Sequence, residues 1–362
     1  MRLECWIPCA TELGDPFVIE LLLFCLTIAA ANDTVLRIDA EAPFPRQISE
    51  YGLFTDATGQ IPSDGLVPYD VISPLFSDYA EKYRFVHIPD GTSITYKEDD
   101  SFEFPVGAAL IKTFAYPALS GDGLDLVETR VMIHRSSGWE GAAYVWNDDQ
   151  TEARLAIAGK RVPVAWRVRD GSERSTTYFV PNMNQCKQCH QPNGETVPIG
   201  FQPRHINRTS TYDGVARNQI DHFVASGILT DTLESVKAPR AARWDDPALA
   251  VEVRARAYLD INCAHCHTPK GMAGHTNLFL TYTQNDPRHR GILKRPTSAG
   301  PASMNMEFAI RPGDPNDSFL LQRLLSTETA IRMPQIMRTV VHEEGVALIR
   351  DWIESLGSEK TE

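Results

Sequence analysis

The stretch DDPALAVEVRARAYLDINCAHCH, residues 245–267, runs from an expected helix directly into a cluster of cysteines and histidines. Asp246-Pro247 is typical of a helix start. Apolar residues then recur at helical spacing, at Val251, Ala255, Tyr258 and Leu259. We therefore expect a helix over residues 245–261 that ends just before Cys263.

The pattern Cys-x-x-Cys-His that follows this helix occurs twice in the chain, as Cys186-Lys187-Gln188-Cys189-His190 and as Cys263-Ala264-His265-Cys266-His267. This order of residues is typical of c-type haem attachment. Two thiols at i and i+3 reach the two vinyl groups of one haem edge, and the imidazole that follows binds the iron axially. The sequence therefore predicts two covalently attached c-type haems. The first would be held by Cys186, Cys189 and His190, and the second by Cys263, Cys266 and His267.

The use of cysteine favours haem over other cofactors. Four of the seven cysteines lie in the two motifs, and Cys5, Cys9 and Cys25 lie in an N-terminal stretch that we expect to be removed. Zinc knuckles also use Cys-x-x-Cys pairs, but their two pairs are usually separated by roughly 15–20 residues. The two motifs here start 77 residues apart (263 − 186). Zinc knuckles also do not require a histidine directly after the second cysteine. A thioredoxin-like redox site is disfavoured because no βαβ pattern surrounds either motif.

Residues 1–31 resemble a signal peptide. An apolar segment runs from Phe17 to Ala31, interrupted only by Glu20, and it ends in three alanines before the polar Asn32. The segment is short for a spanning helix, which needs roughly 20 apolar residues. Covalent haem attachment in bacteria takes place outside the cytoplasm. We therefore expect cleavage near Ala31 and a periplasmic protein, with an uncleaved membrane anchor as the alternative.

The composition and the β-branched runs indicate the N-terminal architecture. The chain has 362 residues and a formal net charge of −12, which argues against nucleic-acid binding as a main role. Residues 40–180 contain no haem motif, and their short β-branched and aromatic runs alternate with turn formers. They predict a β-rich domain, either a sandwich or a meander. The clearest runs are 129–134, 142–146, 154–157, 162–166 and 176–180.

After residue 181 the pattern changes to helices and loops. A short helix is expected over residues 218–226, and another over 342–356, where apolar residues form one stripe and Gly357 follows. A helix leading into the haem motif and a terminal helix match the plan of a small class I cytochrome c. We therefore expect an α+β multidomain protein. The β-rich domain would be followed by a first haem-binding segment, residues 181–240, and a mostly α-helical cytochrome c-like domain, residues 245–358.

A downstream methionine is the usual sixth ligand in such a domain, opposite His267. The candidates are Met272, Met304, Met306, Met333 and Met337. Met333 is favoured because it precedes Pro334 and follows a loop and helix typical of the methionine ligand in bacterial cytochrome c domains. Thioether ligation is expected to raise the reduction potential relative to bis-histidine ligation.

The sixth ligand of the first haem stays open at the level of sequence. His205 and His222 lie between the two motifs, and no methionine follows Cys189 before Met272. The other candidates are His134 and Met132 from the β-rich domain, whereas Met183 is too close to the motif. An open site, with no protein ligand opposite His190, is a further alternative.

Several stretches resemble an uncharacterised family of bacterial di-haem c-type cytochromes. They are SPLFSDYA at 73–80, FPVG at 104–107, IKTF at 111–114, GWEG at 138–141, YVWNDDQ at 144–150, NQCKQCH at 184–190 and NQID at 218–221. The resemblance covers residues 45–356. It implies two covalent haems and electron transfer outside the cytoplasm, and it supplies no substrate.

Three functions are compatible with these features. The leading hypothesis is an electron-transfer protein acting between a periplasmic donor and a periplasmic acceptor, because no substrate site is evident outside the haem motifs. A haem peroxidase or oxidase with an open first haem is the alternative. A third hypothesis is that the β-rich domain docks a partner or a carbohydrate through Trp139, Trp146 and Trp166, although buried core positions are the more common role of tryptophan.

Overall fold

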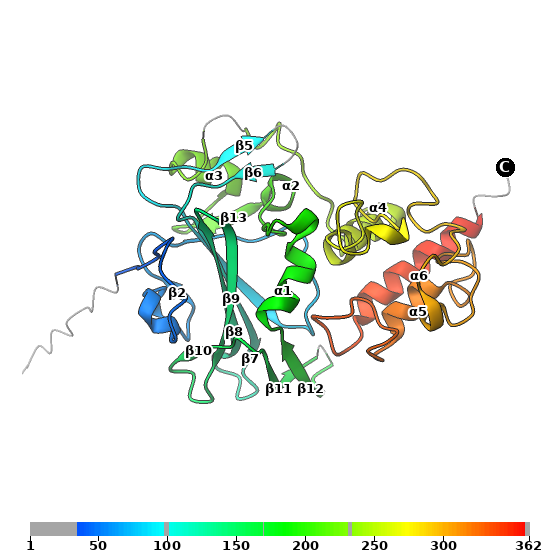
Figure 1. The fold of residues 1–362 in the computed structure, drawn as a ribbon, viewed down its shortest axis with the longest axis horizontal. Coiled ribbons are helices and arrows are strands. Elements are labelled where there is room, and N and C mark those ends of the chain that lie inside the picture. Colours follow the sequence, from blue (N-terminus) through cyan, green and yellow to red (C-terminus); the bar gives the residue numbers. More distant parts are fainter. Residues whose placement is uncertain (1–34, 98–100, 169, 231–233, 359–362) are drawn as a thin grey trace, which may run out of the picture. The chain divides into compact units, whose positions relative to one another are not determined.

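The computed structural model describes residues 35–97, 101–168, 170–230 and 234–358. The leader expected over residues 1–31, with its three cysteines, lies outside these ranges. Strands dominate the described chain up to residue 180, and helices are frequent after it (Figure 1). The protein therefore has an α+β fold. Within these ranges, no helix has the length and apolar character needed to cross a membrane.

The largest sheet has six strands in the order β10-β9-β8-β7-β4-β3. Every neighbouring pair is antiparallel, and β7 to β10 follow one another as a meander. The predicted runs 129–134 and 142–146 lie within β8 and β9. The strands are β3 (Val67–Pro68), β4 (Glu81–His87), β7 (Ala109–Pro117), β8 (Leu124–Arg135), β9 (Gly138–Trp146) and β10 (Ala153–Leu155).

The two faces of this sheet differ in character because successive side chains of a strand point to opposite sides. One face is apolar, and its core includes Ile111, Val131 and Tyr144. The other face carries the alternate residues of the same strands, among them Lys112 and Arg130, which are directly paired across β7 and β8. The second face is therefore the one on which a polar site is formed.

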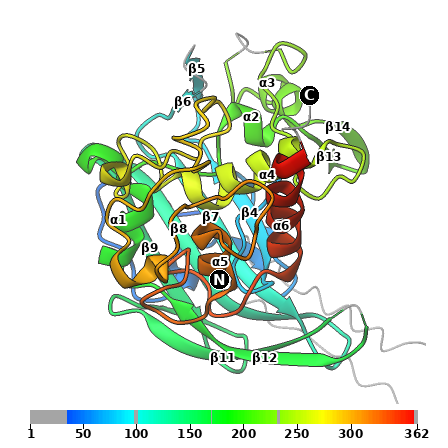
Figure 2. The ribbon, with the colours of Figure 1, turned by 90° about the vertical axis from the view of Figure 1, so that its right-hand side faces the viewer.

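A long hairpin of β11 (Lys160–Arg167) and β12 (Glu173–Val180) completes the β-rich part (Figure 2). Its Trp166 and Tyr178 pack in a core with Phe114 of β7. The predicted runs 162–166 and 176–180 lie in these two strands. Three smaller hairpins pair β1 (Phe54–Asp56) with β2 (Ile61–Pro62), β5 (Thr95–Lys97) with β6 (Ser101–Glu103), and β13 (Thr209–Tyr212) with β14 (Val215–Asn218).

Short helices and 3₁₀ turns occur before the large sheet, after it and within the C-terminal region. They are α1 (Met183–His190), α2 (Pro203–Ile206) and α3 (Gln219–Ala225), together with the 3₁₀ turns η1 (Ile48–Tyr51), η2 (Pro192–Gly194), η4 (Gly274–Thr276) and η5 (Gly300–Ser303). The predicted helix 218–226 corresponds to α3, which begins where the Asn218 side chain accepts a hydrogen bond from the backbone N–H of Ile220 at 2.8 Å.

The C-terminal region contains α4 (Val251–Leu259), a π-helical turn η3 (Asp260–Ala264), α5 (Phe319–Leu325) and α6 (Glu343–Ser358). Tyr258, Leu321, Ile349 and Trp352 form the centre of its apolar core. α6 approaches α4 closely at Gly345, where a Cβ atom would collide with the ring of Tyr258.

The bounds of two predicted helices differ from the structure. The α-helix before the second motif ends at Leu259 and not at residue 261, and the π-helical turn that continues it includes Cys263. The helix before the second motif begins at Val251 and not at Asp246, because Asp246 forms a turn in which its carboxylate accepts from the N–H of Ala248 at 3.0 Å. The C-terminal helix continues through Gly357 to Ser358. Gly357 lies against Gly313, where a side chain would collide with the backbone, so its lack of a side chain serves packing and does not end the helix.

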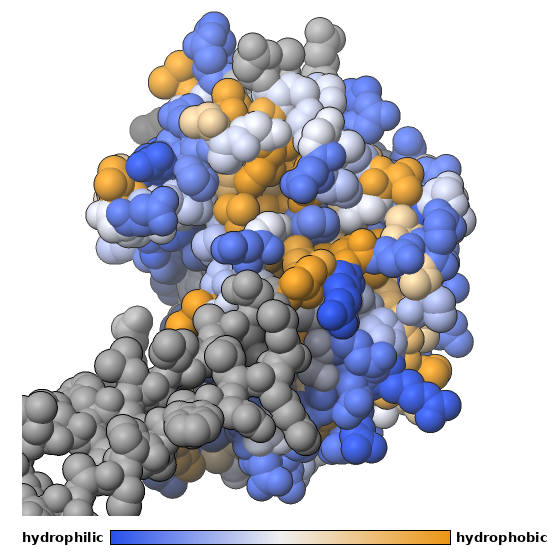
Figure 3. All heavy atoms as spheres, turned by 90° about the vertical axis from the view of Figure 1, so that its left-hand side faces the viewer, coloured by the Kyte–Doolittle hydropathy of each residue, from blue (hydrophilic) through white to orange (hydrophobic). Residues whose placement is uncertain are grey.

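The exposed large apolar side chains are distributed along the chain. On one face of the molecule, apolar groups reach the surface between hydrophilic ones (Figure 3). The most exposed are Val35, Ile157 and Val236, which are distant from one another in sequence. Scattered apolar residues of this kind are normal for a protein surface.

Candidate functional site

The first Cys-x-x-Cys-His motif occupies the helix α1. Asn182 precedes the helix, and its side chain accepts from the N–H of Gln185 at 2.9 Å while the Gln185 side chain accepts from the N–H of Asn182 at 3.0 Å. This reciprocal pair is a capping box. It fixes the start of a helix on which Cys186 and Cys189, three residues apart, share one side. Both cysteines are half-buried.

A cavity of about 930 Å³ lies at this motif, between α1 and the polar face of the large sheet. α1 packs beside β9 (Figure 1). The motif contributes Cys186, Cys189 and His190 to the lining, and the sheet contributes residues of β4, β7, β8 and β9. This volume is near the upper end of the range of roughly 300–1,000 Å³ found for sites of small molecules and cofactors. The cavity is therefore large enough for a prosthetic group at the first motif.

His190 is held in the form that binds a metal. Its Nδ1 lies 2.8 Å from the carbonyl oxygen of Val197. A carbonyl only accepts, so Nδ1 carries the proton and Nε2 has a free lone pair. Burial lowers the pKa of His190 to about 3, which keeps the imidazole neutral. Metal-bound histidines usually donate the other ring N–H in this way.

The second motif begins in the π turn η3, which continues α4, and His267 repeats the arrangement of His190. Nδ1 of His267 lies 3.3 Å from the carbonyl oxygen of Leu278, and burial lowers its pKa to about 4. The turn is anchored by Asn262, whose side chain accepts from the N–H of Phe76 at 2.9 Å. Both motifs thus present a neutral histidine with Nε2 available.

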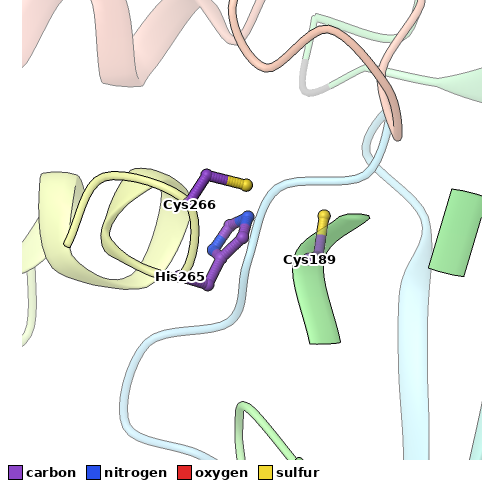
Figure 4. Close-up of side chains that lie close together, drawn as sticks. All are labelled: Cys189, His265 and Cys266. Atoms are coloured by element: carbon purple, nitrogen blue, oxygen red, sulfur yellow. The ribbon is translucent and has the colours of Figure 1, made fainter. Parts of the chain in front are cut away.

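The two motifs meet at their cysteines. Donor atoms of Cys189, His265 and Cys266 all lie within 4.8 Å of one another (Figure 4), and the Cys266 thiol donates to the carbonyl oxygen of Gln188 at 3.6 Å. A hydrogen bond between the two thiols raises the pKa of Cys189 and lowers that of Cys266. This contact could not be predicted from the sequence, because the motifs are far apart in the chain.

The structure separates the residues that the sequence offered as sixth ligands of a haem at the first motif. His222 stacks on Tyr212, with ring centroids 3.6 Å apart, and the buried His205 lies 3.8 Å from a carboxylate oxygen of Asp260. Neither of these histidines belongs to the lining of the large cavity. His134, Met132 and Met183 do line it.

His134 has the same local arrangement as the two motif histidines. Its Nδ1 lies 3.1 Å from the carbonyl oxygen of Pro105, and its ring stacks on Trp139 at 5.0 Å between centroids. Nε2 is therefore the atom with the free lone pair when the ring is neutral. Among the histidines of the described chain that sequence offered for this position, His134 is the one that lines the cavity of the first motif.

Met333 lies in the loop between α5 and α6. Its N–H donates to the carbonyl oxygen of Arg323 at 2.9 Å. The residue lines a second cavity together with Tyr258 and Asn262, the latter next to Cys263. That cavity measures about 10 Å³, which is close to the minimum for one water molecule. The space around Met333 in this conformation does not fit a haem, and Met333 as an iron ligand stays a prediction.

The cavity wall also contains cations that sequence reasoning missed. Arg84, Lys112 and Arg130 lie on neighbouring strands and line the cavity. Burial, followed by the charges of Arg130 and Arg84, lowers the pKa of Lys112 to about 7. Within each strand, the alternation of charged and apolar residues indicates that the charged side chain points away from the apolar face of the sheet. Only the pairing of the strands shows that the three cations are neighbours.

This lowered pKa predicts how Lys112 affects the stability of the haem-free chain. Between about pH 7 and 10.5 the unfolded chain binds a proton on Lys112 that the folded chain does not, so stability falls as the pH falls through this range. Lys112→Met removes the penalty and is expected to stabilise the haem-free protein at pH 7.5 by on the order of 1–3 kcal/mol. Urea unfolding at pH 7.5 measures the effect, and no gain over the wild type would contradict the prediction.

Comparisons with protein-family models, with curated proteins and with solved structures found no match. The chemistry of the site therefore rests on its own residues. The first motif fits a haem in its thiols, its neutral histidine and its cavity. The second motif fits a haem in its two thiols and its neutral histidine.

Proposed function

We propose that this protein is a periplasmic di-haem c-type cytochrome that transfers electrons between a donor protein and an acceptor protein. A c-type haem, when bound, supplies a one-electron iron couple. In this proposal Cys186 and Cys189 hold the first haem and Cys263 and Cys266 the second. Support comes from the sequence, in which every cysteine after residue 31 belongs to a Cys-x-x-Cys-His motif.

The observation that carries the proposal is the shared state of the two motif histidines. In His190 and His267, Nδ1 is bonded to a backbone carbonyl and burial keeps the ring neutral. His134 makes a similar Nδ1 contact, so the contact alone is not distinctive. The proposal is supported because both motifs have such a ring directly after a Cys-x-x-Cys pair. The backbone of each loop orients the ring, as expected of an axial ligand.

The contact between the motifs supports a role in electron transfer. The Sγ atoms of Cys189 and Cys266 lie within 4.8 Å of each other, so groups attached to these two atoms are neighbours. Electron transfer becomes faster as donor and acceptor approach. An arrangement in which each motif places one cysteine beside the other motif suits a protein that moves electrons between two centres.

Redox potentiometry combined with low-temperature EPR tests the proposal on protein produced with the c-haem maturation machinery. We expect two reversible one-electron couples, and a signal from six-coordinate low-spin iron. His190→Gly and His267→Gly are each expected to convert one iron to a high-spin signal, because each removes one axial ligand. The absence of reversible one-electron couples in the wild type would overturn the proposal.

A haem peroxidase or oxidase is the second candidate, and the cavity at the first motif favours it. The cavity of about 930 Å³ at His190 offers room for a small substrate in addition to a prosthetic group. This candidate predicts a high-spin component from one haem and rapid turnover when peroxide is added to the half-reduced protein. Unchanged spectra and no turnover would exclude it in favour of electron transfer.

A further inference from the structure

Basic side chains cluster on the polar face of the large sheet. Lys112 of β7 is directly opposite Arg84 of β4 and Arg130 of β8. Side chains that are opposite on antiparallel strands are about 4.5–5.5 Å apart at Cβ, and like charges there are destabilising. Lys82, two residues before Arg84, points to the same face. All four residues line the cavity of the first motif.

Two of these four cations are compensated by carboxylates. Arg84 pairs with Asp70 at 2.7 Å. Arg130 pairs with the fully buried Glu128 at 2.5 Å, and Glu128 also accepts from the hydroxyl of Tyr178 at 2.8 Å. Each of the two arginines therefore has a carboxylate partner, although Asp70 also pairs with Arg208 at 2.5 Å.

The two lysines have no such partner in the part of the chain that the structure describes. Nζ of Lys82 donates to the carbonyl oxygen of Ala80 at 3.0 Å and forms no ion pair. Lys112 makes neither a hydrogen bond nor an ion pair through Nζ, which lies 5.0 Å from the ring centroid of Phe114. Nζ of Lys82 lies over the same ring at 5.9 Å. Two lysine amino groups thus share one site, and neither has a carboxylate within ion-pair distance among the described residues.

The lysine site is close to the first motif. Lys112 and Arg130 contribute, after burial, to the low pKa of His190, and their charges also act on Cys186. A group attached at Cys186 and Cys189 would therefore occupy the space in front of these cations. Both lysines are half-buried in the cavity wall, where an anion bound in the cavity would favour their charged forms.

We propose that Lys82 and Lys112 bind the two propionate carboxylates of the haem attached at Cys186 and Cys189, while Arg84 and Arg130 hold the rest of the cationic wall in place. This inference rests on the proposed function. The numbers agree, because a haem carries two propionates and the wall has two lysines that form no ion pair among the described residues. The same chemistry would also recognise a small oxyanion from solution, and the test separates these two sources.

The test compares the holoprotein with Lys112→Met, Lys82→Met and the charge-preserving Lys112→Arg. Lys160→Met is the matched control, because Lys160 is an exposed lysine on β11, outside the cavity. The thioethers keep the haem in every variant, and haem content is measured first. We expect Lys112→Met and Lys82→Met to lower the potential of one haem, because a nearby cation favours the reduced state, and to shift its propionate bands in the resonance Raman spectrum.

Lys112→Arg keeps the positive charge and is expected to retain the wild-type potential and propionate bands. Lys160→Met is expected to leave both unchanged. Potentials and propionate bands equal to the wild type in both methionine variants, with two haems still attached, would overturn this inference and leave the proposed function intact. A wild-type haem spectrum that changes on titration with phosphate, while that of Lys112→Met does not, would assign the site to an external anion and also overturn it. A wild-type chain without haem would overturn both.

Discussion

We expect that replacing Cys186 and Cys189 together with alanine removes one of the two proposed haems per chain, and that replacing Cys263 and Cys266 together removes the other. Each pair supplies the two thiols of one Cys-x-x-Cys-His motif, and a c-type haem without its thioethers is held only by its axial ligand and by packing. The measurement is covalent haem per chain, from the absorbance of the denatured protein after extraction of non-covalent haem. We expect half of the wild-type value for each double variant and none for the quadruple variant.

Single-cysteine variants serve as the control for this prediction. Cys186→Ala keeps the second thiol of its pair, Cys189, so some haem remains attached through one bond. If both double variants kept the wild-type amount of covalent haem per chain, the assignment of the cysteines would be wrong. If the cysteines instead bound a metal ion through Cys189, His265 and Cys266, both double variants would lose the same metal and neither would lose haem.

Replacing Asp78 with alanine is expected to lower the free energy of unfolding of the holoprotein by about 2–4 kcal/mol. Asp78 is 1 % exposed. Its carboxylate accepts from the N–H and the hydroxyl of Thr339, at 2.7 and 2.8 Å, and from the N–H of Val340 at 3.0 Å. Alanine leaves these buried donors without an acceptor. Urea unfolding measures the loss.

Two variants distinguish this mechanism from a general effect of losing a charge. Asp78→Asn keeps one acceptor oxygen, and asparagine tolerates the left-handed backbone at this position, where φ is 50°. The free energy of unfolding is therefore expected to fall less for Asp78→Asn than for Asp78→Ala. Asp148→Ala, in an exposed turn, is expected to change stability by less than about 0.5 kcal/mol. Equal losses for Asp78→Ala and Asp148→Ala would contradict the role of Asp78.

The stretch 73–80 illustrates what the sequence could not explain. Its residues carried a resemblance to a family but no chemistry. In the structure, Phe76 donates its N–H to Asn262 next to the second motif, Asp78 binds Thr339 and Val340, and the hydroxyl of Tyr79 donates to Glu344 at 2.9 Å. This segment thus ties the β-rich part to the second motif and to the loop that precedes α6. Contacts between residues so far apart in the chain leave no local pattern.

The two Cys-x-x-Cys-His motifs and the strands of the sheet could be found from the sequence because they depend on short-range patterns. Cys186, Cys189 and His190 are recognisable from their order alone, and the runs in β8 and β9 from their composition. The choice among distal groups could not be predicted. His205 and His222 are closer to the first motif in sequence, but strand pairing places His134 in the cavity lining and leaves the other two outside it.

The cationic wall escaped prediction for the same reason. Arg84, Lys112 and Arg130 are separated by 18 or more residues, and their charges are ordinary in a chain with 35 lysines and arginines. Only the register of β4, β7 and β8 brings them together. The meeting of Cys189 with Cys266 likewise depends on how α1 and the turn after α4 pack. Sequence therefore indicated the groups that we propose carry the chemistry, and the structure showed their neighbours.

The most direct test of covalent attachment of two haems is the intact mass of the chain after export in a bacterium that expresses the c-haem maturation machinery. The proposed function predicts the mass of the processed polypeptide plus two haems, unchanged by denaturation. The same polypeptide with no covalent haem, in preparations where a control c-type cytochrome is fully loaded, would contradict it.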